Sequence, residues 1–109
     1  MEFLMSAPCR HLALCKSSAV ANGTAIKVKK DGLTLAVFNL DGEFFVTDDT
    51  CTHGPGSLSE GMIMDDMVEC DFHNGGFNIK TGEPVLAPCT IALKTYKANL
   101  VADEISIEI

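Results

Sequence analysis

Two short stretches of the chain each combine a cysteine with a histidine. Cys51 and His53 stand in CTHGPG, and Cys70 and His73 stand in CDFHNGG. Thiolate and imidazole are side-chain groups that bind zinc and iron–sulfur clusters. The glycines of both stretches let the backbone approach a ligand closely. The pattern therefore predicts a metal centre whose ligands are Cys51, His53, Cys70 and His73.

The order of the ligand types separates two kinds of metal centre. A zinc site with two cysteines and two histidines usually groups the cysteines together and the histidines together, with the histidines on a helix. Here the chain reads C-x-H and then C-x-x-H, so each stretch carries one ligand of each type. Mixed pairs suit a two-iron cluster, because each loop can send its cysteine to one iron and its histidine to the other. The spacing favours a [2Fe–2S] cluster, with a zinc-stabilised β module for protein interaction as the alternative.

Both stretches follow segments that have the sequence pattern of β-strands. Segments 24–30, 33–40 and 43–48 are joined by Asp31-Gly32 and Asp41-Gly42, which are typical of tight hairpin turns. Further short strands are expected within 67–72, 77–85, 93–101 and 103–109, and Thr81-Gly82 is expected to form another turn. The two Cys/His stretches are therefore expected in loops at strand ends.

Segment 33–40, LTLAVFNL, alternates in the manner of a strand. Its expected faces carry Leu33, Leu35, Val37 and Asn39 on one side, and Thr34, Ala36, Phe38 and Leu40 on the other. Apart from one possible helical turn near 17–21, no segment keeps a helical apolar period. We therefore expect an all-β fold, a small antiparallel sandwich or barrel. The chain is expected to form one domain, 1–109, with its cluster-binding part at roughly 48–90.

The acidic residues are concentrated in the part of the chain that holds both Cys/His stretches. The net charge is −7, and no Lys or Arg occurs between Asp31 and Ile79. The acids of this window are Asp31, Asp41, Glu43, Asp48, Asp49, Glu60, Asp65, Asp66, Glu69 and Asp71. This argues against nucleic acid as a partner, since phosphate contacts need clustered Lys and Arg. It predicts instead an acidic collar that steers a basic protein partner.

The remaining sulfur-containing and histidine residues are expected to be structural. The five cysteines fit no disulfide framework, so those outside the two stretches are interpreted as packed or surface thiols. The third histidine has no partner in its stretch, and the methionines of GMIMDDM are expected to fill the core or its rim. These residues are Cys9, Cys15, Cys89, His11, Met62, Met64 and Met67.

The sequence predicts a cytoplasmic protein. Its uncharged apolar runs are far shorter than the roughly 20 residues that cross a bilayer. The first residues, MEFLMSAPCR, lack the basic region and apolar stretch of a signal peptide. We therefore expect no contact with a membrane.

Three stretches together resemble Rieske-type [2Fe–2S] ferredoxins over nearly the whole chain. They are CTHGPGSLSEG, ECDFHNGGFNIKTGEPV and APCTIALKTY. More narrowly, the chain is similar to the ferredoxin component of bacterial aromatic-ring-hydroxylating dioxygenase systems. The resemblance implies three β-sheets, a cluster-binding tip formed by two hairpin loops, and a covering loop at 83–89 that contains Pro84 and Pro88. One small departure is Ala92, where such ferredoxins often have proline.

The resemblance implies a one-electron carrier rather than an enzyme. The carrier would accept an electron from an NAD(P)H-dependent flavin reductase and pass it to a terminal oxygenase, acting as a monomer in transient complexes. Pro55, Leu58 and Pro88 are expected to form a small apolar contact patch around the exposed edges of the two ligand histidines. No catalytic residue is expected, because an oxygenase also needs an iron held by two histidines and a carboxylate, and only His11 is left for it. A small subunit of another redox enzyme, such as nitrite reductase, is the alternative function.

The same resemblance implies a low reduction potential. High-potential Rieske proteins link their ligand loops by a disulfide, at positions that align here with Gly56 and Phe72. They also place hydroxyl groups beside the cluster sulfurs, at positions that align with Gly75 and Phe77. None of these residues supplies such a bridge or donor, so the potential is expected near the lower Rieske limit of about −150 mV.

Overall fold

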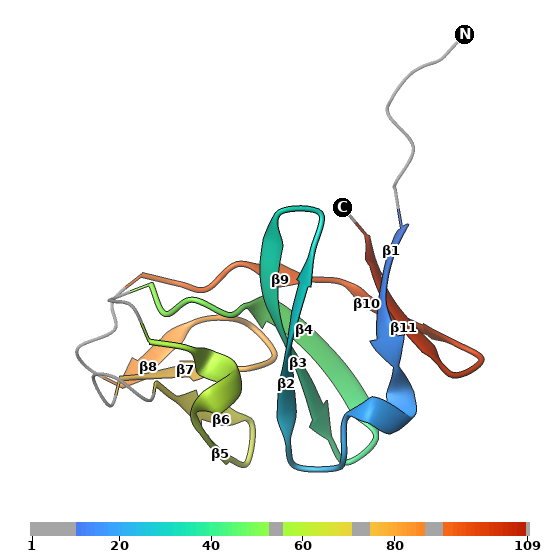
Figure 1. Cartoon of the computed structure of the whole chain (residues 1–109). Coiled ribbons are helices and arrows are strands. Elements are labelled where there is room, and N and C mark those ends of the chain that lie inside the picture. Colours follow the sequence, from blue (N-terminus) through green and yellow to red (C-terminus); the bar gives the residue numbers. More distant parts are fainter. Residues whose placement is uncertain (1–10, 53–55, 71–74, 87–90, 109) are drawn as a thin grey trace, which may run out of the picture.

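The computed structural model describes residues 11–52, 56–70, 75–86 and 91–108, and contains three antiparallel β-sheets (Figure 1). The all-β prediction is confirmed. Among the described residues the helical segments are two short 3-10 helices, η1 (Ser17–Ala19) and η2 (Leu58–Glu60). The first coincides with the helical turn expected near 17–21. Neither helix has the length and apolar character needed to cross a membrane.

A four-stranded sheet occupies the middle of the molecule. Its order is β2 (Ala25–Lys30), β3 (Leu33–Leu40), β4 (Glu43–Asp48) and β9 (Thr95–Tyr96). Lys30 pairs with Leu33 and Leu40 with Glu43, so each hairpin loop has two residues. The loop residues have positive φ, at 51° and 79° in Asp31-Gly32 and 54° and 91° in Asp41-Gly42. This is the turn geometry that the Asp-Gly pairs predict.

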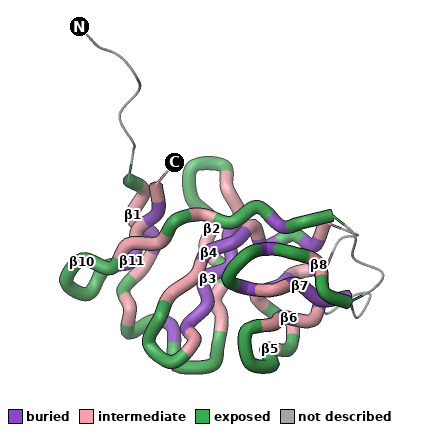
Figure 2. The backbone as a smooth tube through the Cα atoms, turned by 180° about the vertical axis from the view of Figure 1, so that it is seen from behind, coloured by how far each residue is buried: buried purple, intermediate pink, exposed green. Residues whose placement is uncertain are grey.

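The alternation of β3 divides the core into two clusters. Leu35 and Val37 pack with Ile105 and Ile107 of the outer sheet, whereas Ala36 and Phe38 pack toward the other side of the molecule. The predicted two faces are therefore correct, and both of them are buried. Figure 2 shows this buried middle strand between the other two sheets. Burial on both faces explains why the strand is apolar at nearly every position.

The small sheet that carries one ligand loop packs against the Ala36–Phe38 side. Its order is β5 (Met62–Met64), β6 (Met67–Glu69), β7 (Gly76–Asn78) and β8 (Pro84–Leu86). Ile63 pairs with Val68, and Val68 with Phe77, in one row across three strands. This row faces the core, where Val68 and Phe77 are fully buried.

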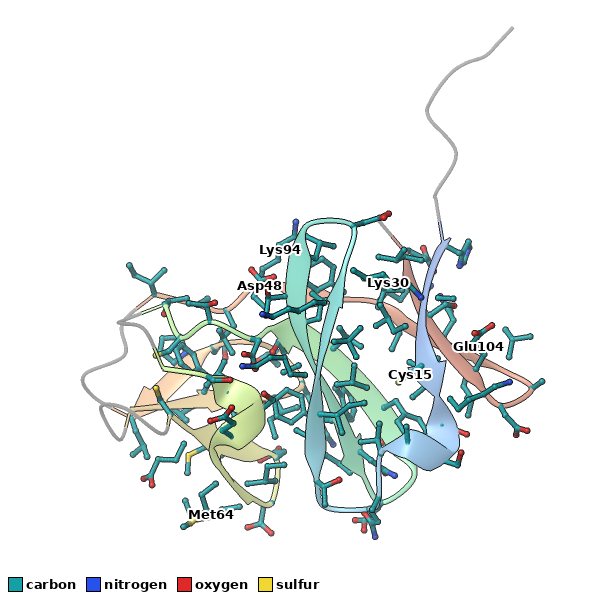
Figure 3. All side chains as sticks on the ribbon, viewed as in Figure 1. Cys15, Lys30, Asp48, Met64, Lys94 and Glu104 are labelled. Carbon is teal, nitrogen blue, oxygen red and sulfur yellow. The ribbon has the colours of Figure 1, made fainter. Side chains whose placement is uncertain are left out.

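The third sheet lies at the opposite end of the molecule from the small sheet (Figure 1). Its order is β1 (His11–Lys16), β11 (Glu104–Glu108) and β10 (Ala98–Val101). Cys15 follows an irregularity in the pairing of β1 with β11 and is half-buried. Burial raises the pKa of its thiol, opposed by the charge of Lys30 and reinforced by that of Glu104 (Figure 3).

Several strand boundaries differ from the sequence expectation. Segment 93–101 forms two strands instead of one, because the chain leaves the middle sheet and joins the outer sheet at Lys97. Strand β6 ends at Glu69 rather than continuing to residue 72. The turn predicted at Thr81-Gly82 lies between β7 and β8. Strands β1 and β5 were not predicted. The three residues Met-Ile-Met of β5 are too few to show an alternation.

Candidate metal centre

The structure brings the two predicted cysteine ligands into one buried cluster. Cys51 follows β4 and is 3% exposed, and Cys70 follows β6 and is 1% exposed. Both pack in the same hydrophobic cluster as Phe77 and Leu93. The two predicted histidine ligands, His53 and His73, lie outside the described residues. The structure therefore describes the two cysteines of the predicted ligand set.

The first ligand loop is closed by main-chain contacts at its base. The Cys51 amide donates a 2.9 Å hydrogen bond to the Gly56 carbonyl, and Thr50 and Ser57 form an isolated antiparallel bridge. The Thr52 hydroxyl donates a 2.7 Å hydrogen bond to the carbonyl of Ile91. These contacts hold the loop to its own strand end and to the segment that leads into β9.

The second ligand loop has the same closure as the first. The Cys70 amide donates a 2.5 Å hydrogen bond to the Gly75 carbonyl. In each loop, therefore, the cysteine amide bonds to the carbonyl of a buried glycine that lies the same number of residues further along the chain. The bases of the two loops are therefore closed in the same way, and each loop begins at a buried cysteine.

Asp49 holds the base of the first ligand loop and is buried. Its carboxylate accepts a 2.6 Å hydrogen bond from the Ser57 hydroxyl and a 2.8 Å hydrogen bond from the Ser59 amide. The carboxylate also forms an ion pair with Lys27. The ammonium nitrogen of Lys27 lies 3.6 Å from Asp49 Oδ2 and 3.7 Å from Glu60 Oε2. Asp49 therefore links the strand before the loop to the helical turn η2 after it.

The placement of Asp49 corrects part of the acidic-collar prediction. The charge pattern counted it among exposed acids, but its side chain is 3% exposed and its charge is compensated by hydrogen bonds and Lys27. No sequence signal distinguishes this role, because Asp49 stands directly beside Asp48 and both are acids in the same stretch. Asp48 instead accepts a 2.7 Å hydrogen bond from the Tyr96 hydroxyl.

The apolar surface near the ligand loops also differs from the expectation. Leu58 was expected in an exposed contact patch with Pro55 and Pro88, but it is fully buried, because η2 turns it into the core. Pro55 and Pro88 lie outside the described residues. In the expected covering loop 83–89, Pro84 belongs to β8 and pairs with Phe77. The large apolar side chains that are exposed near this end include Val85, Leu86 and Ile91.

The chemistry of the described donors fits an iron–sulfur cluster. A cluster of this kind is held by cysteine sulfur, and Cys51 and Cys70 both lie in one apolar cluster, each at the start of a loop. The surrounding apolar side chains exclude water from the sulfur side of the site, which is one of the properties that sets a cluster's reduction potential. The described residues thus define a small β protein in which two similarly closed loop bases place two buried cysteines in one apolar cluster.

Comparison with known proteins identifies the family. The model of the Rieske [2Fe–2S] domain matches residues 10–97, and the chain belongs to this family. Ferredoxin CarAc of Metapseudomonas resinovorans is 40% identical over 97 residues, covering 88% of this chain and 91% of the relative. The biphenyl dioxygenase ferredoxin subunit of Pseudomonas sp. (strain KKS102) is 41% identical over 95 residues, covering 86% and 87%.

Solved structures give the same result. A ferredoxin of Sphingomonas yanoikuyae B1 aligns with a TM-score of 0.87 and 39% identity, covering 92% of this chain and 99% of that one. A chain from the complex of reduced oxygenase and oxidized ferredoxin in carbazole 1,9a-dioxygenase aligns with a TM-score of 0.85 and 39% identity, covering 90% of this chain and 92% of that one. These matches confirm the expected Rieske fold.

The family also decides between the two metal centres that the spacing allowed. The cofactor is a Rieske-type [2Fe–2S] cluster, and the zinc alternative is not supported. The assignment of the individual ligands Cys51, His53, Cys70 and His73 stays a prediction.

Proposed function

We propose that this protein is the ferredoxin component of a multicomponent aromatic-ring-hydroxylating dioxygenase. The observation that carries the proposal is similarity over most of the chain to proteins that are themselves ferredoxin components of such systems. These relatives are electron-transfer components rather than catalytic subunits. The chain accordingly carries single electrons and catalyses no reaction alone.

The proposed ligands are Cys51, His53, Cys70 and His73. When bound, the [2Fe–2S] cluster supplies storage for one electron. The residues of the chain hold it: the two cysteines anchor it from inside the core, and the closed loop bases keep their sulfurs at a fixed separation. The two histidines would complete the set, one from each loop.

The proposed partners are an NAD(P)H-dependent flavin reductase and a terminal oxygenase. A ferredoxin 39% identical to this chain has been solved in a complex with the oxygenase of carbazole 1,9a-dioxygenase, which supports the oxygenase as a partner. We expect transient complexes with a monomeric carrier in the cytoplasm. The exposed acids Glu60, Asp65 and Asp66 on the side of the small sheet would raise the association rate with a basic partner surface.

A role as the small subunit of nitrite reductase has weaker support. A nitrite reductase small subunit from Mycobacterium tuberculosis aligns with a TM-score of 0.83 but only 18% identity, which is a likeness of fold. The ferredoxin relatives are about twice as similar in sequence.

Reconstitution from purified components tests the proposal. The holoprotein is mixed with NADH and the reductase and oxygenase of the same system, and product formation is measured with and without this chain. We expect product only when the chain is present. As a matched control, the Cys70→Ser variant should fail to support turnover, whereas Cys15→Ser should support it fully, because Cys15 lies in β1 at the opposite end. Undiminished turnover without the chain would contradict the proposal.

A further inference from the structure

The outer face of the small sheet carries a group of methionines. Met62 pairs with Glu69, Glu69 with Gly76, and Gly76 with Leu86, so these four residues form one row across the sheet. Met64 pairs with Met67 two residues further along β5, in the second row on the same face. Directly paired residues point to the same side of a sheet, and the alternate row, with Val68 and Phe77, faces the core. We call Met62, Met64, Met67 and Leu86 the methionine face.

The methionine face is exposed and continuous. Met62 is 61% exposed and Met64 is 40% exposed, and Met64 extends away from the ribbon at the edge of the molecule (Figure 3). Gly76 lies under the face, because a Cβ atom there would lie 3.1 Å from Leu86 Cδ1 and 3.3 Å from Met67 Sδ. The absence of a side chain at Gly76 thus lets Leu86 and Met67 cover the sheet from either side.

The charges around the methionine face are negative. Asp65 and Asp66 form the turn between β5 and β6, and Glu69 stands within the row of Met62. The basic residue nearest in the sequence, Lys80, has its ammonium group over the ring of Phe45, 5.7 Å from the centroid. A partner surface that fits this face therefore has an apolar centre with Lys or Arg around it.

The face begins where the second ligand loop begins. Glu69 immediately precedes Cys70, and Gly76 immediately follows Gly75, whose carbonyl closes the loop. The row with Met62 and Leu86 is therefore the row of the small sheet next to the proposed cluster. A protein that docks on the ligand loops and extends to this side covers the methionine face.

We propose that the methionine face is a docking surface for the terminal oxygenase, in which methionine side chains pack on an apolar area bordered by basic residues. This inference rests on the proposed function. Methionine side chains are flexible and polarizable, so they adapt to a partner surface and can release it again, as a carrier requires. The acidic residues beside them orient the approaching oxygenase and raise the association rate constant.

The test measures binding of the oxygenase of the same system to the holoprotein by calorimetry. The double variant Met62→Thr/Met64→Thr keeps β-forming residues on the strand and removes most of the exposed apolar area of β5. We expect its dissociation constant for the oxygenase to rise by about tenfold or more. The visible spectrum of the cluster should stay unchanged, which shows that the ligand loops are intact.

The matched control is Leu100→Thr/Val101→Thr. These two residues are also exposed apolar side chains on a strand, but they lie on β10 in the sheet at the opposite end of the molecule. This variant should bind the oxygenase like the wild type. A second arm, Asp65→Asn/Asp66→Asn, should make binding less sensitive to ionic strength, and asparagine tolerates the positive φ of 56° at position 65.

The outcomes separate the inference from the function on which it rests. Failure of the wild-type holoprotein to bind or reduce the oxygenase would overturn the proposed function. Wild-type binding with equal affinity in the methionine variant would overturn only the docking surface. Weakened binding to the reductase alone, or a wild-type dimer in sedimentation that the methionine variant dissociates, would assign the face to a different occupant and likewise overturn the inference.

Discussion

The carboxylate of Asp49 accepts a 2.6 Å hydrogen bond from the hydroxyl of Ser57, and this contact joins the two ends of the first ligand loop. The same carboxylate accepts a hydrogen bond from the amide of Ser59. The loop is therefore closed by a side chain as well as by the main-chain hydrogen bond between Cys51 and Gly56. The position of Cys51 depends on this arrangement.

Replacement of Asp49 by alanine should destabilise the protein. It removes the carboxylate that accepts hydrogen bonds from the half-buried Ser57 hydroxyl and Ser59 amide, and hydrogen bonds to a charged group are among the stronger ones. We expect the free energy of unfolding to fall by about 3 kcal/mol, measured by circular dichroism in urea. Asp103→Ala, in the exposed turn before β11, is the control for loss of one negative charge. Equal stability of the two variants would contradict the role of Asp49.

The single tyrosine of the chain should titrate at unusually high pH. Burial, followed by the hydrogen bond to Asp48 and the charge of that carboxylate, raises the pKa of Tyr96 from 10.0 to about 12. Because there is one tyrosine, a pH titration followed by the ultraviolet absorbance of tyrosinate measures the pKa of Tyr96 alone. In Asp48→Asn the pKa should fall toward its ordinary value without reaching it, because burial persists. A wild-type pKa near 10.0 would contradict the assignment.

The same shift predicts the pH dependence of stability at alkaline pH. The folded state favours the protonated phenol, so the contribution of Tyr96 is fully present below pH 10.0 and is lost as the pH rises to about 12. The free energy of unfolding should decrease over this window. Tyr96→Phe, which has no ionisable group at this position, should show a smaller decrease than the wild type.

Gly82 should be intolerant of alanine. It has a φ of +80°, and a Cβ atom there would collide with the Leu93 carbonyl oxygen and lie 3.0 Å from Thr95 Cγ2. Strain and overpacking together should lower the free energy of unfolding by about 3 kcal/mol. Gly23→Ala is a matched control, because its φ is +78° and no atom lies within 4 Å of the added Cβ. This variant should lower the free energy of unfolding only by the backbone strain of a positive φ, about 1 kcal/mol.

The reduction potential should lie near the lower Rieske limit. Phe77 is fully buried and has an apolar ring, and Gly75 has no side chain, so neither residue offers a side-chain donor to the site. Without such hydrogen bonds we expect a potential of about −150 mV in a redox titration. A strongly positive potential would contradict this prediction.

The sequence predicted those features that depend on neighbours along the chain. The Asp-Gly turns and the alternation of 33–40 are local signals, and the structure confirms them. Asp49 and Leu58 were misplaced on the surface, because their burial depends on how η2 folds back onto β4 and the core. A charge pattern treats adjacent acids alike, although Asp48 and Asp49 contact different parts of the fold.

Electron paramagnetic resonance of the dithionite-reduced holoprotein tests the central claim most directly. The account predicts a spectrum with the low average g value of an iron held by nitrogen and sulfur ligands. His73→Ala should lose this spectrum, whereas His11→Ala, which changes the one histidine outside the proposed ligand set, should keep it. A silent reduced protein, or a spectrum with the higher average g value of an all-cysteine cluster, would contradict the account.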